Sequence, residues 1–171
     1  WETICPCTPN AIWKDPLRKA LNKLASEIDQ VYLDFVGDYS RNPWQLRNDF
    51  INVLLEKQSL DELIRKSLAK RCDKNIQKKI GYLLKGQYER LRMFTSCGWF
   101  FDEFHRIEPQ NNIAYATKSV WLTQQATGKH VEDLALRLLH DVKSTRTGLR
   151  ADTVFSQTWI RANDLFNNGL S

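Results

Sequence analysis

Two consecutive carboxylates, Asp102 and Glu103, are the residues whose type and setting most suggest chemistry in this chain. They directly follow three aromatic residues, Trp99, Phe100 and Phe101. Paired carboxylates perform the acid and base steps of glycoside cleavage, and an aromatic ring can stack on the apolar face of a sugar. We therefore interpret this aromatic and acidic segment as either a buried helix junction or the wall of a binding site.

Helix geometry argues against catalysis by the two acids alone. Consecutive helical residues point about 100° apart, so Asp102 and Glu103 do not face one another across a bond. A position at a helix start, where carboxylates stabilise the helix dipole, is the favoured interpretation. The adjacent aromatic side chains must also point in different directions. We expect Trp99 to face the site and Phe100 to face the core.

The thiols and imidazoles form no complete catalytic or metal-binding set. Cys97 could act as a nucleophile beside a histidine, but His105 lies about two helical turns further on. We therefore expect Cys97 to be a buried structural thiol. Cys5-Pro6-Cys7 lacks a second pair at zinc spacing, and no phosphate loop or nucleophile elbow occurs. We predict no catalytic residue, no metal and no cofactor.

The composition narrows the class of protein. The chain has 171 residues, of which 42% are hydrophobic, and this suits one compact domain. Seven glycines and five prolines are too few for a fibrous or disordered protein. No apolar run approaches the ~20 residues of a membrane span, and no signal peptide is recognisable. With four cysteines and no disulfide pattern, these features predict a cytoplasmic protein without a membrane partner.

The net charge of +5 is unevenly distributed along the chain. Basic residues gather between Arg65 and Arg92, where only Asp73 and Glu89 oppose them. Such a stretch could contact nucleic acid or an acidic partner. A solvated helical face is the preferred interpretation.

Capping signals and apolar periodicity predict helices along most of the chain. Asp15-Pro16 and Asn42-Pro43 each pair a cap residue with a proline suited to a first helical turn. Ser59 and Glu62 form a capping box. Asp73 and Asp152 are expected to cap two further helices, and others are expected to begin near residues 108 and 131. The helix from residue 73 is expected to break at Gly98. Because no segment alternates with a two-residue period, we predict an all-α bundle of about six or seven helices with short connections.

The domain organisation is expected to be simple. Residues 1–14 resemble a linker or the tail of an upstream domain, and residues 15–171 are expected to form a single helical domain. The chain starts at Trp1 and its only methionine is Met93, so we expect it to be a piece of a longer protein.

The segment Met93–Glu103 resembles a signature of the helical region that follows the catalytic barrel in a subgroup of glycoside hydrolase family 57. That region is usually catalogued as a domain of unknown function. The most specific part is Ser96-Cys97-Gly98-Trp99-Phe100-Phe101-Asp102. Weaker matches extend the resemblance over most of the chain, at Trp13–Leu21, Asn42–Trp44, Ile113–Ala116 and Glu132–Ser144. Cys5-Pro6-Cys7 departs from the family's Cys-Gly-Cys, because its proline forbids the same turn.

The resemblance implies a parent enzyme that cleaves α-linked glucans or related sugars by a retaining mechanism. Such a mechanism uses a nucleophile and an acid about 5 Å apart, and in the family both come from the upstream barrel. We therefore expect an accessory helical domain that shapes the cleft of that barrel and is not catalytic alone. Its expected contacts with oligosaccharide are Trp99, Phe101, Asp102 and Glu103. The alternative is a basic-faced module that binds nucleic acid or another protein.

Overall fold

A computed structural model describes residues 9–69 and 72–167 of the chain. Within these ranges the protein is helical and has no strand, apart from an isolated bridge between Lys143 and Arg150. The elements, in chain order, are η1 (Pro9–Trp13), α1 (Lys14–Gly37), α2 (Pro43–Asp49), α3 (Ile51–Leu54), α4 (Leu60–Ser67), α5 (Lys74–Arg92), α6 (Cys97–Phe100), α7 (Ile107–Thr127), α8 (Glu132–Leu139) and α9 (Ala151–Asn167). The predicted all-α bundle is confirmed, and seven of the described helices have seven or more residues.

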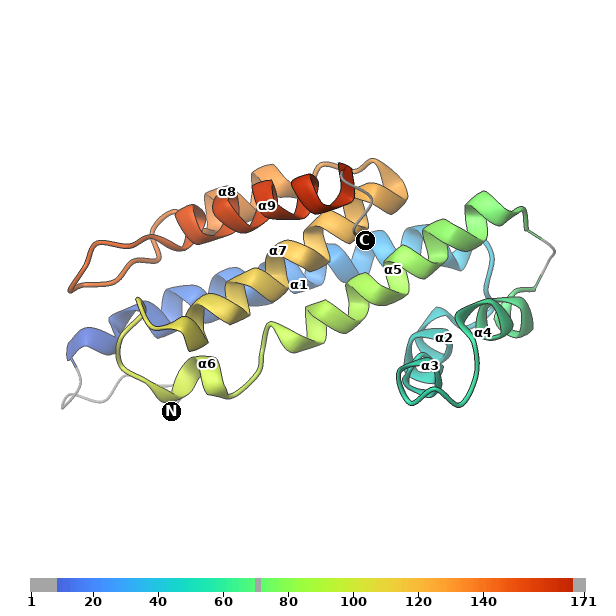
Figure 1. The fold of residues 1–171 in the computed structure, drawn as a ribbon, viewed down its shortest axis with the longest axis horizontal. Coiled ribbons are helices and arrows are strands. Elements are labelled where there is room, and N and C mark those ends of the chain that lie inside the picture. Colours follow the sequence, from blue (N-terminus) through green and yellow to red (C-terminus); the bar gives the residue numbers. More distant parts are fainter. Residues whose placement is uncertain (1–8, 70–71, 168–171) are drawn as a thin grey trace.

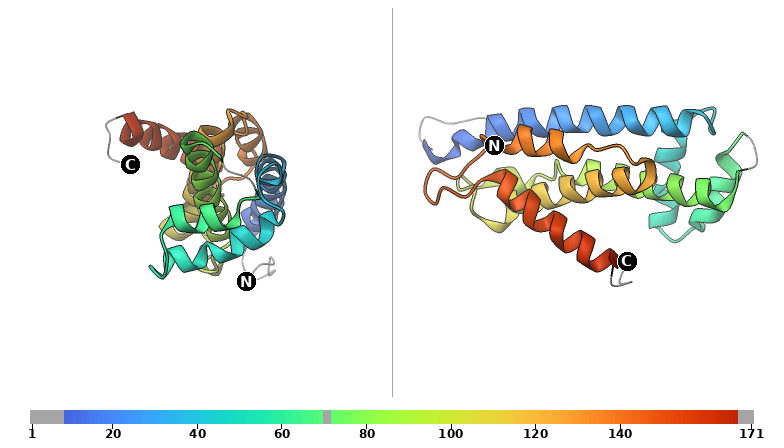
Figure 2. Two further views of the ribbon diagram at one scale, coloured as in Figure 1. Left: turned by 90° about the vertical axis from the view of Figure 1, so that its right-hand side faces the viewer. Right: turned by 90° about the horizontal axis from the view of Figure 1, so that it is seen from above.

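Three long helices, α1, α5 and α7, pack side by side and give the molecule its elongated form (Figure 1). The short helices α2, α3 and α4 gather at one end of these three, whereas α6 lies at the other end. Helix α8 packs on α1, and α9 packs on α7 and α8. Seen from above, α9 runs obliquely and its last turns project from the bundle (Figure 2). None of the described helices is both long and apolar enough to cross a membrane.

The apolar core has two parts that meet along α1. The first part joins α1 to α7, α8, α9 and the aromatic segment around Trp99. The second part begins near Tyr32, in the last turns of α1, and joins it to α2, α4 and α5. Each part buries the apolar stripe of an amphipathic helix, which is the principal source of stability in such bundles.

Several predicted helix boundaries are confirmed by their cap geometry. The side chains of Asn42, Ser59 and Asp73 each accept a hydrogen bond from the backbone N–H three residues on, at 3.1, 3.1 and 2.7 Å. Each bond satisfies one of the donors that a helix start leaves unpaired. Gly128 ends α7 in the left-handed conformation, with φ of 72°, as a C-terminal glycine commonly does.

Two predicted caps, Asp15 and Asp152, are wrong. Helix α1 begins at Lys14 because η1 runs directly into it and Trp13 already has helical angles. Asp15 therefore lies inside the first turn. Asp152 likewise lies in the first turn of α9, which begins at Ala151. Part of the segment that was expected to be a linker forms η1, and its Trp13 is buried in the core.

Candidate functional site

Gly98 fixes the geometry of the signature segment. The predicted helix break at Gly98 is wrong, because α5 ends at Arg92 and Gly98 lies inside the short helix α6. A Cβ atom at this position would lie 2.5 Å from Cγ of the buried Asn112 in α7. Thr95 holds that amide from both sides: its hydroxyl donates to Asn112 Oδ1 at 2.8 Å, and its carbonyl accepts from Nδ2 at 3.2 Å. Only glycine therefore fits between α6 and α7 here.

The structure reverses the expected directions of two aromatic side chains. Trp99 is 2% exposed and stacks on Trp13, with ring centroids 6.1 Å apart. The guanidinium of Arg18 lies 4.1 Å from the centroid of the Trp99 ring. Phe100, which was expected in the core, is 60% exposed. Because its indole is buried against these groups, Trp99 cannot stack on a sugar, and its role is to anchor α6 to the bundle.

Asp102 is held at the surface by the start of α1. Its carbonyl oxygen accepts a hydrogen bond from Nε1 of Trp13 at 2.7 Å. Its carboxylate lies 3.8 Å from Nζ of Lys14, a side chain that is 4% exposed, whereas the Asp102 side chain is 46% exposed. A buried ammonium thus supports a carboxylate that still has free acceptor positions toward solvent.

Glu103 is held by different partners. Its Oε1 accepts a hydrogen bond from Nδ2 of Asn10 at 3.0 Å, and its Oε2 lies 3.3 Å from Nδ1 of His105. Asn10 in turn accepts a hydrogen bond from the hydroxyl of Thr145, in the connection between α8 and α9. Three segments that are distant in sequence therefore meet around this carboxylate.

Phe101 lies half-buried between Phe100 and Arg106. The two phenyl rings meet edge to face with centroids 5.1 Å apart, and the Arg106 guanidinium lies 3.8 Å from the Phe101 centroid. Arg106 also forms an ion pair with Glu108, and its hydrogen bond is the main cause that lowers the pKa of the Glu108 carboxyl. The next residue, Ile107, is 64% exposed.

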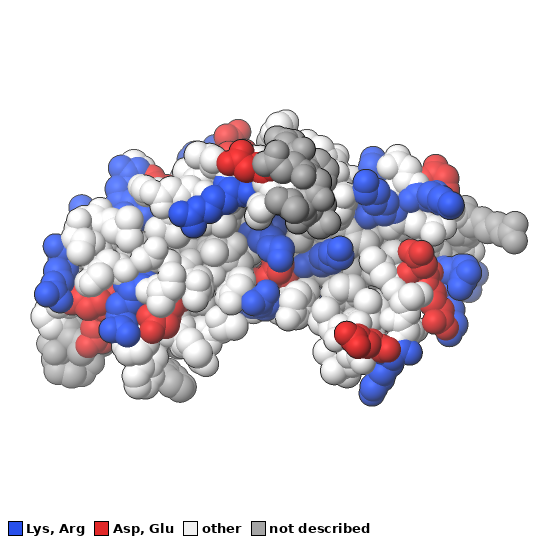
Figure 3. Space-filling model, viewed as in Figure 1, with Lys and Arg blue, Asp and Glu red and all other residues white. Residues whose placement is uncertain are grey.

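We call these neighbouring groups the aromatic–acidic end; its members are Asn10, Trp13, Lys14, Phe101, Asp102, Glu103, His105, Arg106 and Ile107. It lies at the end of the molecule that carries α6 (Figure 1). Acidic and basic side chains are mixed over this end in the space-filling view (Figure 3). This end therefore carries positively and negatively charged side chains that can donate and accept hydrogen bonds. It also carries the exposed apolar side chain of Ile107.

Other predictions about this segment were wrong. The acids do not begin a helix, because Asp102 and Glu103 lie in the connection between α6 and α7. Cys97 is exposed rather than buried, and the His105 imidazole faces Glu103.

The described ranges contain no group of three or more His, Cys, Asp or Glu side chains suited to a metal. Cys5 and Cys7 lie outside the described residues.

Sequence reasoning missed the residues that position the acids. Asn10, Lys14 and Thr145 are ordinary polar residues, and each reaches the site only through contacts across long stretches of chain. One signal could have pointed to Lys14: it directly follows Trp13 at the start of a predicted helix. Because η1 ends at Trp13 and α1 begins at Lys14, both side chains lie at the end of the molecule that carries α6.

Residues 10–163 match the sequence model of a protein family described as Domain of unknown function (DUF3536). The match covers nearly all of the described part of the chain, including the whole aromatic–acidic end. No curated protein and no solved structure matches the chain.

Proposed function

This chain belongs to the family Domain of unknown function (DUF3536), and we propose that it is an accessory helical domain of a glycoside hydrolase resembling family 57. In this proposal the chain docks on an upstream catalytic barrel of the same polypeptide and forms one wall of its substrate cleft. The observation that carries the proposal is the aromatic–acidic end, where the half-exposed carboxylate of Asp102 is followed closely by an exposed Ile107 at the start of α7.

The aromatic–acidic end suits binding rather than bond cleavage. A retaining glycosidase needs two carboxyl groups that face the scissile bond from opposite sides. Asp102 and Glu103 are consecutive, and each is anchored to a different partner, Lys14 or Asn10. This arrangement supports a domain that is not catalytic alone and leaves the bond-breaking carboxylates to the barrel.

The sugar contacts follow from the exposure of each side chain. Trp99 is buried inside the bundle, so it is not a candidate for stacking on a sugar ring. Asp102 keeps acceptor positions for the hydroxyl groups of an α-glucan, and Glu103 and Phe101 lie beside it. Ile107 supplies apolar area that would be buried against the barrel.

A cytoplasmic location belongs to the same proposal. The exposed thiol of Cys97 suits a reducing compartment.

The proposal is tested by measuring hydrolysis of a maltooligosaccharide. The isolated chain is expected to release no reducing sugar above the buffer rate, whereas the full protein that contains the barrel is expected to be active. Asp102→Asn in the full protein should lower kcat/KM by about tenfold, because a charged acceptor to the sugar is lost. Asp133→Asn, in an exposed position of α8, is the matched control and should leave kcat/KM unchanged. Clear turnover by the isolated chain would contradict the accessory role.

A further inference from the structure

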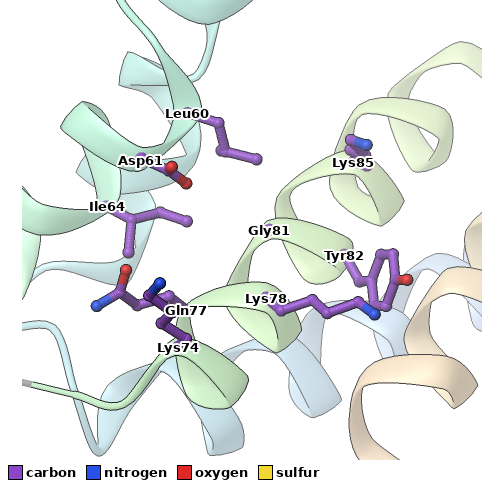
Figure 4. A pocket seen from close by; sticks show the side chains of 9 residues that line it. All are labelled: Leu60, Asp61, Ile64, Lys74, Gln77, Lys78, Gly81, Tyr82 and Lys85. Carbon is purple, nitrogen blue, oxygen red and sulfur yellow. The ribbon is translucent and has the colours of Figure 1, made fainter.

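A groove of about 480 Å³ lies between α4 and α5, at the end of the molecule away from α6 (Figures 1 and 4). Its floor is apolar. Leu60 and Ile64 point from α4 toward α5, where Gly81 faces them without a side chain (Figure 4). A Cβ atom at Gly81 would lie 3.1 Å from Cδ2 of Leu60. The missing side chain therefore leaves room for Leu60 to pack closely against the backbone of α5.

The α5 rim of the groove is basic. Lys74, Lys78 and Lys85 line it, and all three are exposed. Among the described carboxylates, none forms an ion pair with these lysines, although Lys66 in α4 pairs with Glu62 at 2.6 Å. The Lys78 ammonium lies 5.6 Å from the centroid of the Tyr82 ring. The rim thus holds three ammonium groups that form no ion pair with a described carboxylate, opposite the single acidic lining residue Asp61.

We propose that this groove is a docking site for an acidic amphipathic segment of a partner protein. An apolar side chain of that segment would lie against Leu60, which is partly exposed, whereas Ile64 and Gly81 are buried. Its carboxylates would face the three lysines. Charge complementarity over an apolar floor is the pattern of helix-in-groove recognition. This partner differs from the proposed catalytic barrel, because the groove and the aromatic–acidic end lie at opposite ends of the bundle.

Nucleic acid fits the groove less well. A phosphate backbone has no apolar side chain to cover the floor, and Asp61 on the α4 wall would repel it. Acidic side chains also interrupt the basic ones over this end of the molecule (Figure 3). On this face the basic side chains therefore do not form one continuous cationic surface.

The test is a fluorescence anisotropy titration of the full chain. The probe is a short labelled helical peptide with leucines on one face and glutamates on the other. We expect saturable binding that Lys78→Glu and Lys85→Glu each weaken by about tenfold. Lys23→Glu, a charge reversal at another exposed lysine, on α1, should change the affinity by less than about twofold. Circular dichroism checks that all variants remain helical.

Two further ligands test whether the apolar floor contributes to binding and whether the groove prefers an acidic peptide to nucleic acid. The same peptide with serines in place of leucines should lose affinity, because the apolar floor is then uncovered. A single-stranded oligonucleotide should bind more weakly than the acidic peptide. The proposal is overturned if the peptide does not bind, if Lys23→Glu weakens binding as much as the groove variants, or if the oligonucleotide binds more tightly with a steep dependence on salt.

Discussion

At the scale of single residues, Gly98 and Asn112 explain why the signature segment has its sequence. Asn112 is buried and hydrogen-bonded to Thr95, so its amide cannot move away from α6. The backbone of α6 approaches it so closely that no side chain fits at Gly98. This contact turns Trp99 toward the bundle. The signature is therefore in large part a packing motif.

Gly98→Ala is expected to destabilise the protein. Its methyl group would overlap the Asn112 side chain, and overpacking of this kind costs about 1–3 kcal/mol of unfolding free energy. Urea denaturation of the variant and wild type measures the difference. Gly37→Ala is the matched control, because a Cβ atom there meets nothing within 4 Å. Equal stability of the Gly98 variant and wild type would contradict the packing account.

The ion pair of Asp152 makes a second prediction, on pH dependence. Burial raises the pKa of Asp152, but the hydrogen bond and charge of Arg150 outweigh burial and lower it overall. A lowered carboxyl pKa adds stability above the pKa of the unfolded chain, and this stability is lost as pH falls through the folded pKa. Asp152→Asn should therefore cost about 1 kcal/mol at neutral pH.

The difference between wild type and Asp152→Asn should shrink as the solution becomes acidic. Urea unfolding at a series of pH values measures it, with Asp133→Asn in α8 as the exposed control. A difference that stays constant down to acid pH would show that Arg150 does not act through the charge of Asp152.

The directions of Trp99 and Phe100 could not be predicted from the sequence. They depend on where α5 ends and on which face of α6 meets α7, and both depend on contacts such as Gly98 with Asn112. The partners of Asp102 and Glu103 could not be predicted from the sequence either, because Lys14 and Asn10 lie near the start of the described chain, far from the two acids in sequence.

At the scale of elements, helix starts were predictable where the capping bond is local. The capping side chains of Asn42, Ser59 and Asp73 each accept a hydrogen bond from a backbone N–H only three residues away. A short stretch of sequence is therefore enough to predict these helix starts. Asp15 failed as a cap because η1 continues into α1. Asp152 failed because its carboxylate binds Arg150 instead.

Glu89 joins the two helices with the most extensive contact, α5 and α7. It is 3% exposed, accepts a hydrogen bond from Arg92 at 3.0 Å and lies 2.8 Å from Nζ of Lys118. Glu89→Gln keeps the shape but removes the charge that balances both cations. We expect a loss of about 2 kcal/mol in unfolding free energy.

Thermal and urea denaturation of Glu89→Gln measure this loss. Glu62→Gln removes the exposed pair with Lys66 in α4 and is the matched control, expected to unfold like wild type. If the two variants are equally stable, Glu89 does not hold α5 to α7.

At the scale of the whole molecule, the long helices α1, α5 and α7 separate two surfaces of different character. The aromatic–acidic end carries mixed charges and an exposed Ile107, whereas the opposite end carries the lysine-lined groove. The all-α class followed from periodicity and caps alone. The pairing of the helices did not, because it is set by side chains such as Glu89 and Asn112 that act between distant segments.

The most direct test of the accessory role is a calorimetric titration of the separately produced upstream barrel with this chain. We expect a saturable complex of one chain with one barrel. Ile107→Asp at the aromatic–acidic end should weaken it by at least about tenfold, since a charge would replace buried apolar area. Ile160→Asp in α9, at a site 60% exposed against 64% for Ile107, should leave binding unchanged. Absence of a complex, or equal weakening by both variants, would contradict the account.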